Sequence, residues 1–239
     1  MKAIVQSIKT IFHFRSSCYL CQQKFRDQKF RKKTLCKACQ NFLSHTEFFC
    51  TICGNALPQK NICGQCLISP PLYQQTIPCF WYEEPIQTLI HDYKFNQKLS
   101  LTPILGNLMA EKIQTHYQNT AYPNCIIPMP IHPKRLRERG YHQVYELAKI
   151  LSHQLSIPVK LNTCRRIKHS QPQSDLPFKE RKENIKNVFQ AKKILYQHIA
   201  ILDDVITTGE TVSELCKTLK KENSHLMIDV WCLARTKFT

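Results

Sequence analysis

The chain has 239 residues, of which 43% are hydrophobic and 21% are charged, and this composition is typical of a globular protein. No apolar run approaches the ~18 residues of a membrane-spanning helix, so we expect no membrane insertion. The formal net charge of +17 favours a polyanionic partner, either nucleic acid or a phosphorylated small molecule. The alternative is a generally basic surface that only keeps the protein in solution.

The first residues are not typical of a secretory signal. Ile4, Ile8, Ile11 and Phe12 lie at helical spacing with polar residues between them, so no continuous apolar segment forms. This spacing predicts a short amphipathic helix, and we expect a cytoplasmic protein.

Eight of the thirteen cysteines form four C-x-x-C pairs near the start of the chain. Two residues between two thiolates allow one tight turn to aim both sulfurs at a single tetrahedral ion, and a second pair completes the ligand shell. We therefore predict two closed structural Zn²⁺ sites, in preference to redox dithiols or disulfides. Sequential pairing is the simplest arrangement, although the spacing also permits interleaved pairing. The expected ligands are Cys18, Cys21, Cys36, Cys39, Cys50, Cys53, Cys63 and Cys66.

Two further features of this segment carry predictions. Gly54 and Gly64 follow or lie within C-x-x-C turns, where a positive φ is often needed. Residues 24–37 form a basic run that contains Phe25 and Phe30, and cations interleaved with aromatic rings are typical of surfaces that bind single-stranded nucleic acid. A solvated loop whose two phenylalanines pack on the metal site is an equally good interpretation.

Pro70, Pro71 and Pro78 lie in an uncharged stretch that we interpret as the junction between two domains, over residues 1–70 and 71–239. The second domain alternates helix and strand signals, which predicts an α/β fold with a mainly parallel sheet. The expected helices cover residues 85–91, 101–118, 141–155 and 211–222. The expected strands and extended segments cover residues 124–131, 159–167, 185–192, 198–204 and 225–234.

Two patterns in the second domain predict buried positions. The helix over residues 141–155 places Val144, Leu147, Leu151 and Leu155 on one face. The five cysteines outside the C-x-x-C pairs are scattered singly, and burial as small hydrophobic side chains is their default interpretation. They are Cys79, Cys125, Cys164, Cys216 and Cys232.

The stretch "ILDDVITTGET" joins the strand over residues 198–204 to the next helix. Asp203 and Asp204 close the strand, and the Thr-Thr-Gly turn after them offers hydroxyl groups and free backbone N–H groups to an anion. Two carboxylates beside that turn would repel a phosphate, so the ligand should also present hydroxyl groups or a Mg²⁺ ion to them. A sugar phosphate meets both demands, because its 5′-phosphate fits the turn and its 2′- and 3′-hydroxyls fit the acids.

Three segments together resemble a known family. "ILDDVITTGET" resembles the phosphoribosyl-pyrophosphate (PRPP) signature of type I phosphoribosyltransferases. "IIPMPIHPKRLRERGYHQVYELAK" resembles the pyrophosphate loop of that fold as ComF family proteins carry it, with His142 where asparagine is usual. "RRIKHSQPQSDLPFKERKENIKNVF" resembles the family's flexible loop over the site, with Ile185 where valine is usual. The C-x-x-C pairs match the family's double zinc ribbon, so the resemblance covers residues 15–236.

The resemblance implies a type I phosphoribosyltransferase-like α/β fold with a mainly parallel sheet, preceded by a small four-cysteine zinc-ribbon module. It implies a PRPP site, with Mg²⁺ accompanying the ligand. The expected PRPP contacts are Asp203, Asp204, Val205, Ile206, Thr207, Thr208, Gly209, Glu210 and Thr211. The residues expected near the pyrophosphate are Ile131, His132, Arg135, Arg139 and Lys94.

The ComF resemblance also implies a biological role. It predicts a protein of natural transformation that handles incoming single-stranded DNA in the cytoplasm, with other competence proteins as possible partners. The alternative is an active phosphoribosyltransferase with an unidentified acceptor. Thr207 stands where purine-salvage members place an aspartate as general base, so we assign no catalytic residue and leave enzyme activity undecided.

Overall fold

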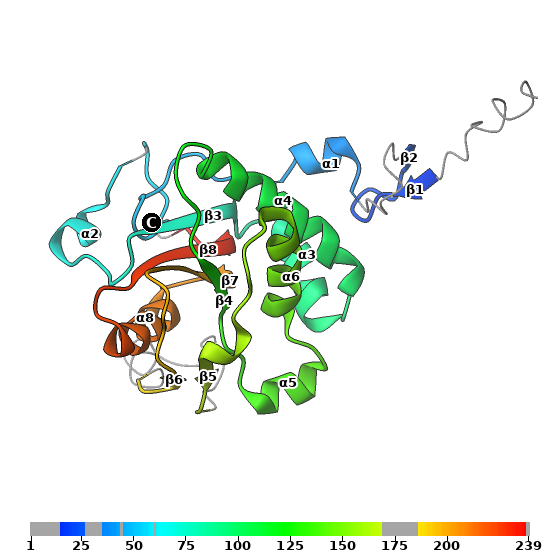
Figure 1. Cartoon of the computed structure of the whole chain (residues 1–239). Helices are drawn as coiled ribbons and strands as arrows, with labels where there is room; N and C mark the ends of the chain where they lie inside the picture. The colour runs from blue at the N-terminus through cyan, green and yellow to red at the C-terminus, as the bar shows by residue number, and fades with distance from the viewer. Residues whose placement is uncertain (1–14, 27–34, 44, 60, 169–185, 238–239) are drawn as a thin grey trace, which may run out of the picture. The chain divides into compact units, whose positions relative to one another are not determined.

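The computed structural model describes residues 15–26, 35–43, 45–59, 61–168 and 186–237 (Figure 1). Two compact units, Met1–Leu43 and Ser44–Thr239, divide the chain. None of the helices described is long and apolar enough to cross a bilayer. The helix expected at the start of the chain and most of the loop expected over the site fall outside the described residues.

The first unit contains a small antiparallel pair and one short helix. Strand β1 (Arg15–Ser17) pairs with β2 (Lys24–Arg26), and helix α1 (Lys37–Asn41) begins directly after Cys36. Phe25 lies in β2, whereas Phe30 falls outside the described residues. The interpretation of this basic run as a nucleic-acid surface therefore stays a prediction.

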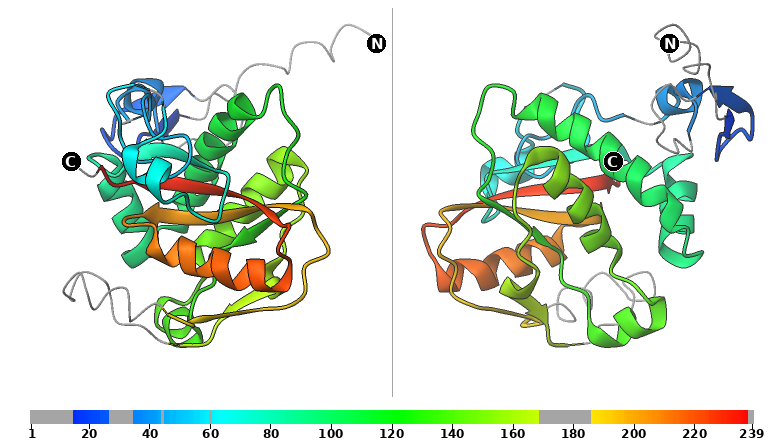
Figure 2. Two further views of the ribbon diagram at one scale, coloured as in Figure 1. Left: turned by 90° about the vertical axis from the view of Figure 1, so that its left-hand side faces the viewer. Right: turned by 45° about the vertical axis from the view of Figure 1, so that its right-hand side comes forward.

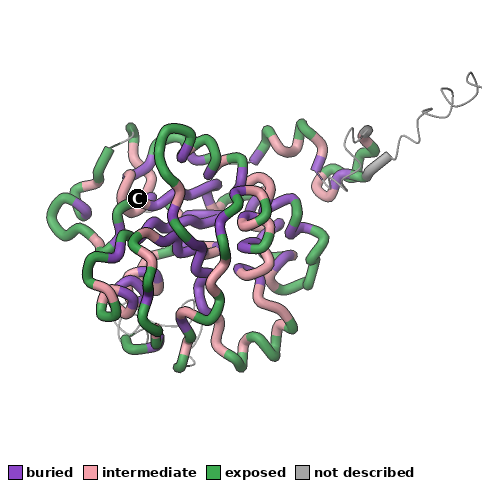
Figure 3. Tube along the Cα trace, in the orientation of Figure 1, coloured by how far each residue is buried: buried purple, intermediate pink, exposed green. Residues whose placement is uncertain are grey.

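The second unit is built on a four-stranded sheet in which every neighbouring pair is parallel. In spatial order its strands are β3 (Gln75–Trp81), β8 (Met227–Arg235), β7 (His198–Ile206) and β4 (Cys125–Pro128). Leu202 of β7 lies opposite both Trp231 of β8 and Pro128 of β4. The strands are buried on both faces (Figure 3), which explains why their sequences are apolar runs without alternation. The predicted α/β class with a mainly parallel sheet is confirmed.

Helices cover both faces of this sheet (Figure 2). Val212, Leu215 and Leu219 of α8 join Ile199 and Ile201 of β7 in one core cluster on one face. Helices α4 and α6 pack on each other and on the opposite face, against β3, β4 and β7. The helices of this unit are α2 (Gly64–Ile68), α3 (Ile86–Phe95), α4 (Thr102–His116), α5 (Pro133–Arg139), α6 (Gln143–Leu155) and α8 (Glu210–Glu222).

The buried positions predicted from the sequence are confirmed. The apolar face of α6, from Val144 to Leu155, is buried, and so are the five single cysteines. Residues 159–167 and 185–192 are less regular than expected, because only Cys164–Arg166 (β5) and Phe189–Ala191 (β6) are strands. These two strands pair antiparallel with each other and lie outside the main sheet.

Two segments differ from the sequence interpretation. The junction expected around the three prolines contains β3, which includes Pro78. Because β3 is an outer strand of the four-stranded sheet, a residue without an N–H can stand in it. The basic segment expected as a loop is helix α5, which starts with Pro133 and ends at Gly140 with a φ of 80°.

Candidate functional site

The cysteines form two four-sulfur clusters, one in each compact unit. Cys18, Cys21, Cys36 and Cys39 make the first cluster, and the ligand atoms of each cluster lie within 4.8 Å of one another. The second cluster consists of Cys50, Cys53, Cys63 and Cys66. Pairing is therefore sequential, which decides between the two arrangements that the spacing permits.

Backbone N–H groups stabilise a thiolate at the same position in both clusters. The N–H of Cys36 donates to Cys18 Sγ over 3.4 Å, and the N–H of Cys63 donates to Cys50 Sγ over 3.3 Å. Burial alone would raise the pKa of Cys50, but the backbone N–H groups of Cys53, Cys63 and Ile52 lower it to about 7. Four converging sulfurs, one of which is stabilised as a thiolate by backbone N–H groups, fit a structural Zn²⁺.

The second cluster is joined to the sheet by hydrogen bonds. Thr76 of β3 donates its hydroxyl to Ile52 O over 2.7 Å, and Arg235 of β8 donates Nε to Cys53 O over 3.3 Å. Gly54 has the predicted positive φ of 71°, whereas Gly64 does not, because it begins helix α2. The compact unit that holds the second cluster is therefore the one that holds the sheet.

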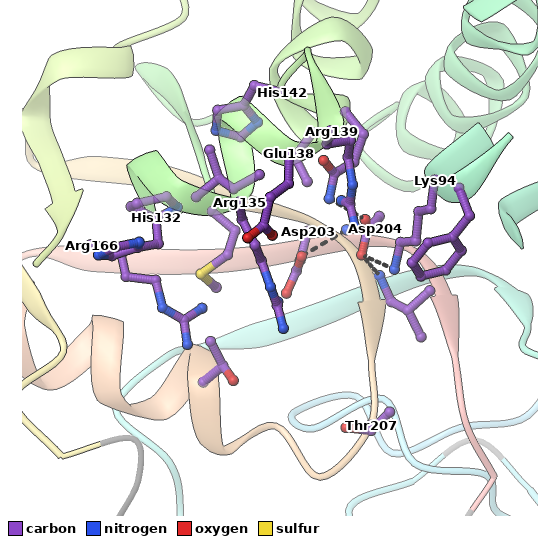
Figure 4. A pocket seen from close by; sticks show the side chains of 18 of the residues that line it. Lys94, His132, Arg135, Glu138, Arg139, His142, Arg166, Asp203, Asp204 and Thr207 are labelled. Carbon is purple, nitrogen blue, oxygen red and sulfur yellow. Dashed lines mark hydrogen bonds and ion pairs between the residues drawn. The ribbon is translucent and has the colours of Figure 1, made fainter. Parts of the chain in front are cut away.

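A pocket of about 670 Å³ opens at the carboxyl ends of β4 and β7 (Figure 4), where ligands bind in open parallel sheets. It gathers acids, cations and threonines that lie far apart in the sequence. Of the residues predicted for the site, it is lined by Lys94, Ile131, His132, Arg135, Arg139, Asp203, Asp204, Val205, Thr207 and Thr211.

The other four predicted residues build the turn without lining the pocket. Ile206 is buried and still belongs to β7, which runs two residues beyond the acids. Thr208 Oγ1 accepts the N–H of Glu210 over 3.4 Å, and Gly209 has a φ of 80° directly before α8. The turn is therefore shaped by a left-handed glycine and a threonine that caps the helix start.

The two aspartates of the pocket are held differently. Asp204 Oδ1 lies 2.8 Å from Lys94 Nζ and accepts the Val205 N–H, while Oδ2 accepts the Gln143 amide over 3.1 Å. Burial favours the neutral form of Asp204, but Lys94 and these donors outweigh it and lower its pKa. Burial and the neighbouring Asp204 charge raise the pKa of Asp203 to about 7. Asp204 is thus held as a carboxylate by its neighbours, whereas the pKa of Asp203 lies close to neutral pH.

Several basic side chains converge on the same space as the acids (Figure 4). Arg135 and Arg139 come from α5, and Arg166 comes from β5. Burial lowers the pKa of Arg166, and the nearby Arg135 lowers it further. Burial also lowers the pKa of Arg139. Guanidinium groups that are partly desolvated and close to one another form a site prepared for an anion.

His142 caps helix α6 at the position where the family resemblance led us to expect an asparagine. Its Nδ1 accepts the N–H of Tyr145 over 3.2 Å and so caps the start of α6, as an asparagine oxygen would. Burial lowers the pKa of His142 to about 4, so the ring is neutral at physiological pH. Its Nε2 is buried without a hydrogen-bond partner among the described residues.

Arg166, Gln143 and Phe95 are among the pocket residues to which the sequence analysis assigned no role. Arg166 belongs to the "RRI" segment, but nothing in its spacing indicates that β5 reaches the pocket. Gln143 stood in a family motif without a function, and it now binds Asp204. Phe95 follows Lys94 at the end of α3 and lines the pocket, where the residue is 63% exposed. The guanidinium carbon of Arg139 lies 5.4 Å from the centroid of the Phe95 ring.

Comparisons with known proteins agree with this architecture. Residues 11–67 match the family model described as "Double zinc ribbon domain". Competence protein F of Haemophilus influenzae is 33% identical over 94% of this chain and 98% of its own length. DNA utilization protein YhgH of Escherichia coli K12 is 30% identical over 84% of this chain and 90% of its own. Competence protein ComFC of Bacillus subtilis is 20% identical, with coverage of 92% and 95%.

Two solved structures show a partial likeness to this chain. Leishmania donovani UMP synthase shares 12% identity at a TM-score of 0.31, covering 59% of this chain and 22% of that one. Adenine phosphoribosyltransferase of the same organism shares 10% at a TM-score of 0.27, covering 55% and 64%. Likenesses this low do not bear on the ligand.

The cysteine clusters and the α/β unit define a zinc-ribbon protein with a parallel sheet and a charged pocket at its carboxyl edge. Similarity to competence protein F over 94% of this chain then shows the family to which the chain belongs. The chain belongs to the ComF family of competence and DNA utilization proteins.

Proposed function

We propose that this protein handles single-stranded DNA in the cytoplasm during DNA uptake, and that its pocket binds PRPP or a closely related ribose phosphate. One observation carries the second part: the pocket sets a carboxylate pair and a threonine turn against a cluster of guanidinium groups. A ligand with vicinal hydroxyls and more than one phosphate complements that arrangement. A simple phosphate does not, because the acids would repel it.

Each part of the pocket has a role in this proposal. The turn from Thr207 to Thr211 would hold the 5′-phosphate, and Arg135, with Arg139 and Arg166, would neutralise the pyrophosphate. Asp203 would accept hydrogen bonds from the ribose hydroxyls, because Asp204 is already held by Lys94.

Mg²⁺ fits the same arrangement. Carboxylate and phosphate oxygens are the ligands that Mg²⁺ prefers, and Asp203 together with the pyrophosphate would supply them. The ion would neutralise charge on the pyrophosphate. The proposal does not include catalytic turnover of PRPP, because no residue of the pocket is assigned as the base that would activate an acceptor. Release of pyrophosphate from PRPP in the presence of a panel of nucleophiles would support the alternative of an active transferase.

The DNA part is supported by charge and by family. The formal net charge is +17, and relatives of similar length are named competence and DNA utilization proteins. Zinc ribbons beside a basic surface are typical of nucleic-acid binding. The same proposal includes interaction with other competence proteins.

Calorimetric titration with PRPP, in the presence and absence of Mg²⁺, tests the pocket. Arg135→Ala and Asp203→Asn should each weaken PRPP binding at least about 10-fold, because they remove a charged contact to the ligand. Arg137→Ala is the matched control, since Arg137 belongs to the same helix but does not line the pocket. Equal affinities of wild type, both pocket variants and the control would contradict the proposed site.

A separate titration tests the DNA part. Binding of a labelled single strand should weaken as salt rises, with a linear dependence of log K on log salt concentration. Asp203→Asn should leave this binding unchanged, which would separate the two functions. No binding of a single strand at about 50 mM salt would remove the DNA part of the proposal.

A further inference from the structure

A second hollow, of about 470 Å³, lies outside the charged pocket and shares none of its lining residues. We call it the basic groove. Its lining contains lysines, hydroxyl and amide groups but no carboxylate. The lining residues are Tyr145, Val159, Lys160, Leu161, Asn162, Thr163, Lys192 and Lys193. The lysines of this lining attract anions, and the lining has no carboxylate that could accept hydrogen bonds from ribose hydroxyls.

The fold brings the cations of this groove together from two distant segments. Strands β5 and β6 pair antiparallel, and the Lys192 N–H donates to Thr163 O over 2.9 Å where the groove begins. Residues 159–168 and 186–195 contain no Asp or Glu. Their basic residues are Lys160, Arg165, Arg166, Lys168, Lys186, Lys192 and Lys193. Among the described residues, no carboxylate forms an ion pair with the three lysines of the groove.

Aromatic rings lie among these cations. Tyr145, in the first turn of α6, lines the groove, and Lys149 Nζ lies 5.3 Å from the centroid of its ring. Lys160 Nζ lies 5.5 Å from the centroid of Tyr196. Cations that follow a phosphate backbone, next to rings on which bases stack, are the two components of a single-strand binding surface.

We propose that the basic groove binds the phosphodiester backbone of single-stranded DNA, with a base stacked on Tyr145. This inference rests on the proposed function and assigns its DNA contact to the α/β unit. A single strand fits better than a duplex, because only unpaired bases expose a face to an aromatic ring. Among the described residues, no carboxylate ion pair offsets the charge of these three lysines, so their positive charge is available to phosphates.

Fluorescence anisotropy of a labelled 20-mer with the full-length protein tests the groove. Replacement of Lys160, Lys192 and Lys193 by Ala should weaken single-strand binding by on the order of 10-fold at low salt. The slope of log K against log salt concentration should become shallower by about 2, since each lost phosphate contact contributes about 0.7. The matched control replaces Lys217, Lys220 and Lys221 of α8 by Ala, which changes the net charge equally.

Substitution of Tyr145 provides a second test in which the net charge of the protein does not change. Tyr145→Ala should weaken single-strand binding about 5-fold or more while leaving duplex binding unchanged, and Tyr145→Phe should retain the wild-type affinity. Thermal unfolding of every variant verifies that it folds.

The outcomes distinguish a failure of the basic-groove inference from a failure of the proposed DNA handling. A larger loss in the groove variant than in the α8 variant supports the groove. Equal losses, or no loss in either variant while the wild type binds, overturn the groove and leave DNA handling intact. Failure of the wild type to bind a single strand overturns both.

Discussion

Lys94 and Asp204 form an ion pair inside the charged pocket, with 2.8 Å between Nζ and Oδ1. Only 19% of the lysine side chain and 7% of the aspartate side chain are exposed. With Gln143 and the Val205 N–H also bound to it, Asp204 has its oxygens occupied by the protein itself. The two aspartates of the sequence signature are therefore held differently: Asp204 is bound by groups of the protein itself, whereas its neighbour Asp203 lines the pocket without an ion pair to Lys94.

Lys94→Met should destabilise the protein by about 3–5 kcal/mol, because it leaves a buried carboxylate without its partner. Urea unfolding at neutral pH measures the loss. The double variant Lys94→Met with Asp204→Asn should recover a large part of it, since no buried charge then remains. A double variant as unstable as the sum of the two single variants would show that the pair is not coupled.

His142→Asn should remove a pH dependence of stability. The pKa of His142 is lowered to about 4 in the folded protein, against about 6.5 in an unfolded chain, so the unfolded state binds more protons between these values. Wild-type stability should therefore fall as the pH is lowered from about 6.5 to about 4. Asparagine keeps the helix cap and cannot be protonated.

Urea unfolding of wild type and His142→Asn across this pH range checks the prediction. The difference in unfolding free energy should shift in favour of the asparagine variant as the pH falls. A constant difference across the range would contradict the burial of a neutral ring. Gln143 next to it should keep its bond to Asp204 in both proteins.

Removing one zinc ligand should affect the sheet differently in the two clusters. Cys63→Ser should lower the melting temperature of the α/β unit by at least about 5 °C, because the second cluster is hydrogen-bonded to β3 and β8. Cys36→Ser should leave that temperature unchanged, because its cluster belongs to the other compact unit.

Tryptophan fluorescence gives this measurement selectively. Both tryptophans of the chain, Trp81 and Trp231, lie in strands of the main sheet. Elemental analysis should show the loss of one zinc ion per chain in each variant. Equal shifts of the fluorescence transition in the two variants would contradict separate roles for the clusters.

Gly106→Ala should destabilise the protein although it lies within helix α4, where alanine normally stabilises by about 1 kcal/mol. A Cβ atom at this position would lie 2.7 Å from Ile150 in α6, so the two helices would have to move apart. We expect a net loss of about 1–3 kcal/mol. Gly64→Ala is the control, because nothing lies within 4 Å of its Cβ position, and equal stabilities would contradict the close packing of α4 on α6.

Much of the fold could be predicted because its signals are local. The C-x-x-C spacing predicted the ligands of both clusters, and the periodicity of residues 141–155 predicted the buried face of α6. We interpreted Pro78 as part of a junction and did not predict that it lies in strand β3. No local feature of the sequence indicates that this strand lies at an edge of the sheet. Arg166 was missed for a related reason: its approach to the pocket depends on the pairing of β5 with β6, more than twenty residues later.

By itself, the sequence determined which cysteines could bind metal and which segment supplies the aspartates and threonines of the pocket, because those groups are neighbours along the chain and short-range geometry aims them together. Only the tertiary structure decided the partners across long separations. It paired the cysteines in sequence order, brought Lys94 to Asp204 and joined the lysines of the basic groove. These contacts depend on the order of parallel strands and on helix packing, which follow from burial of the whole core.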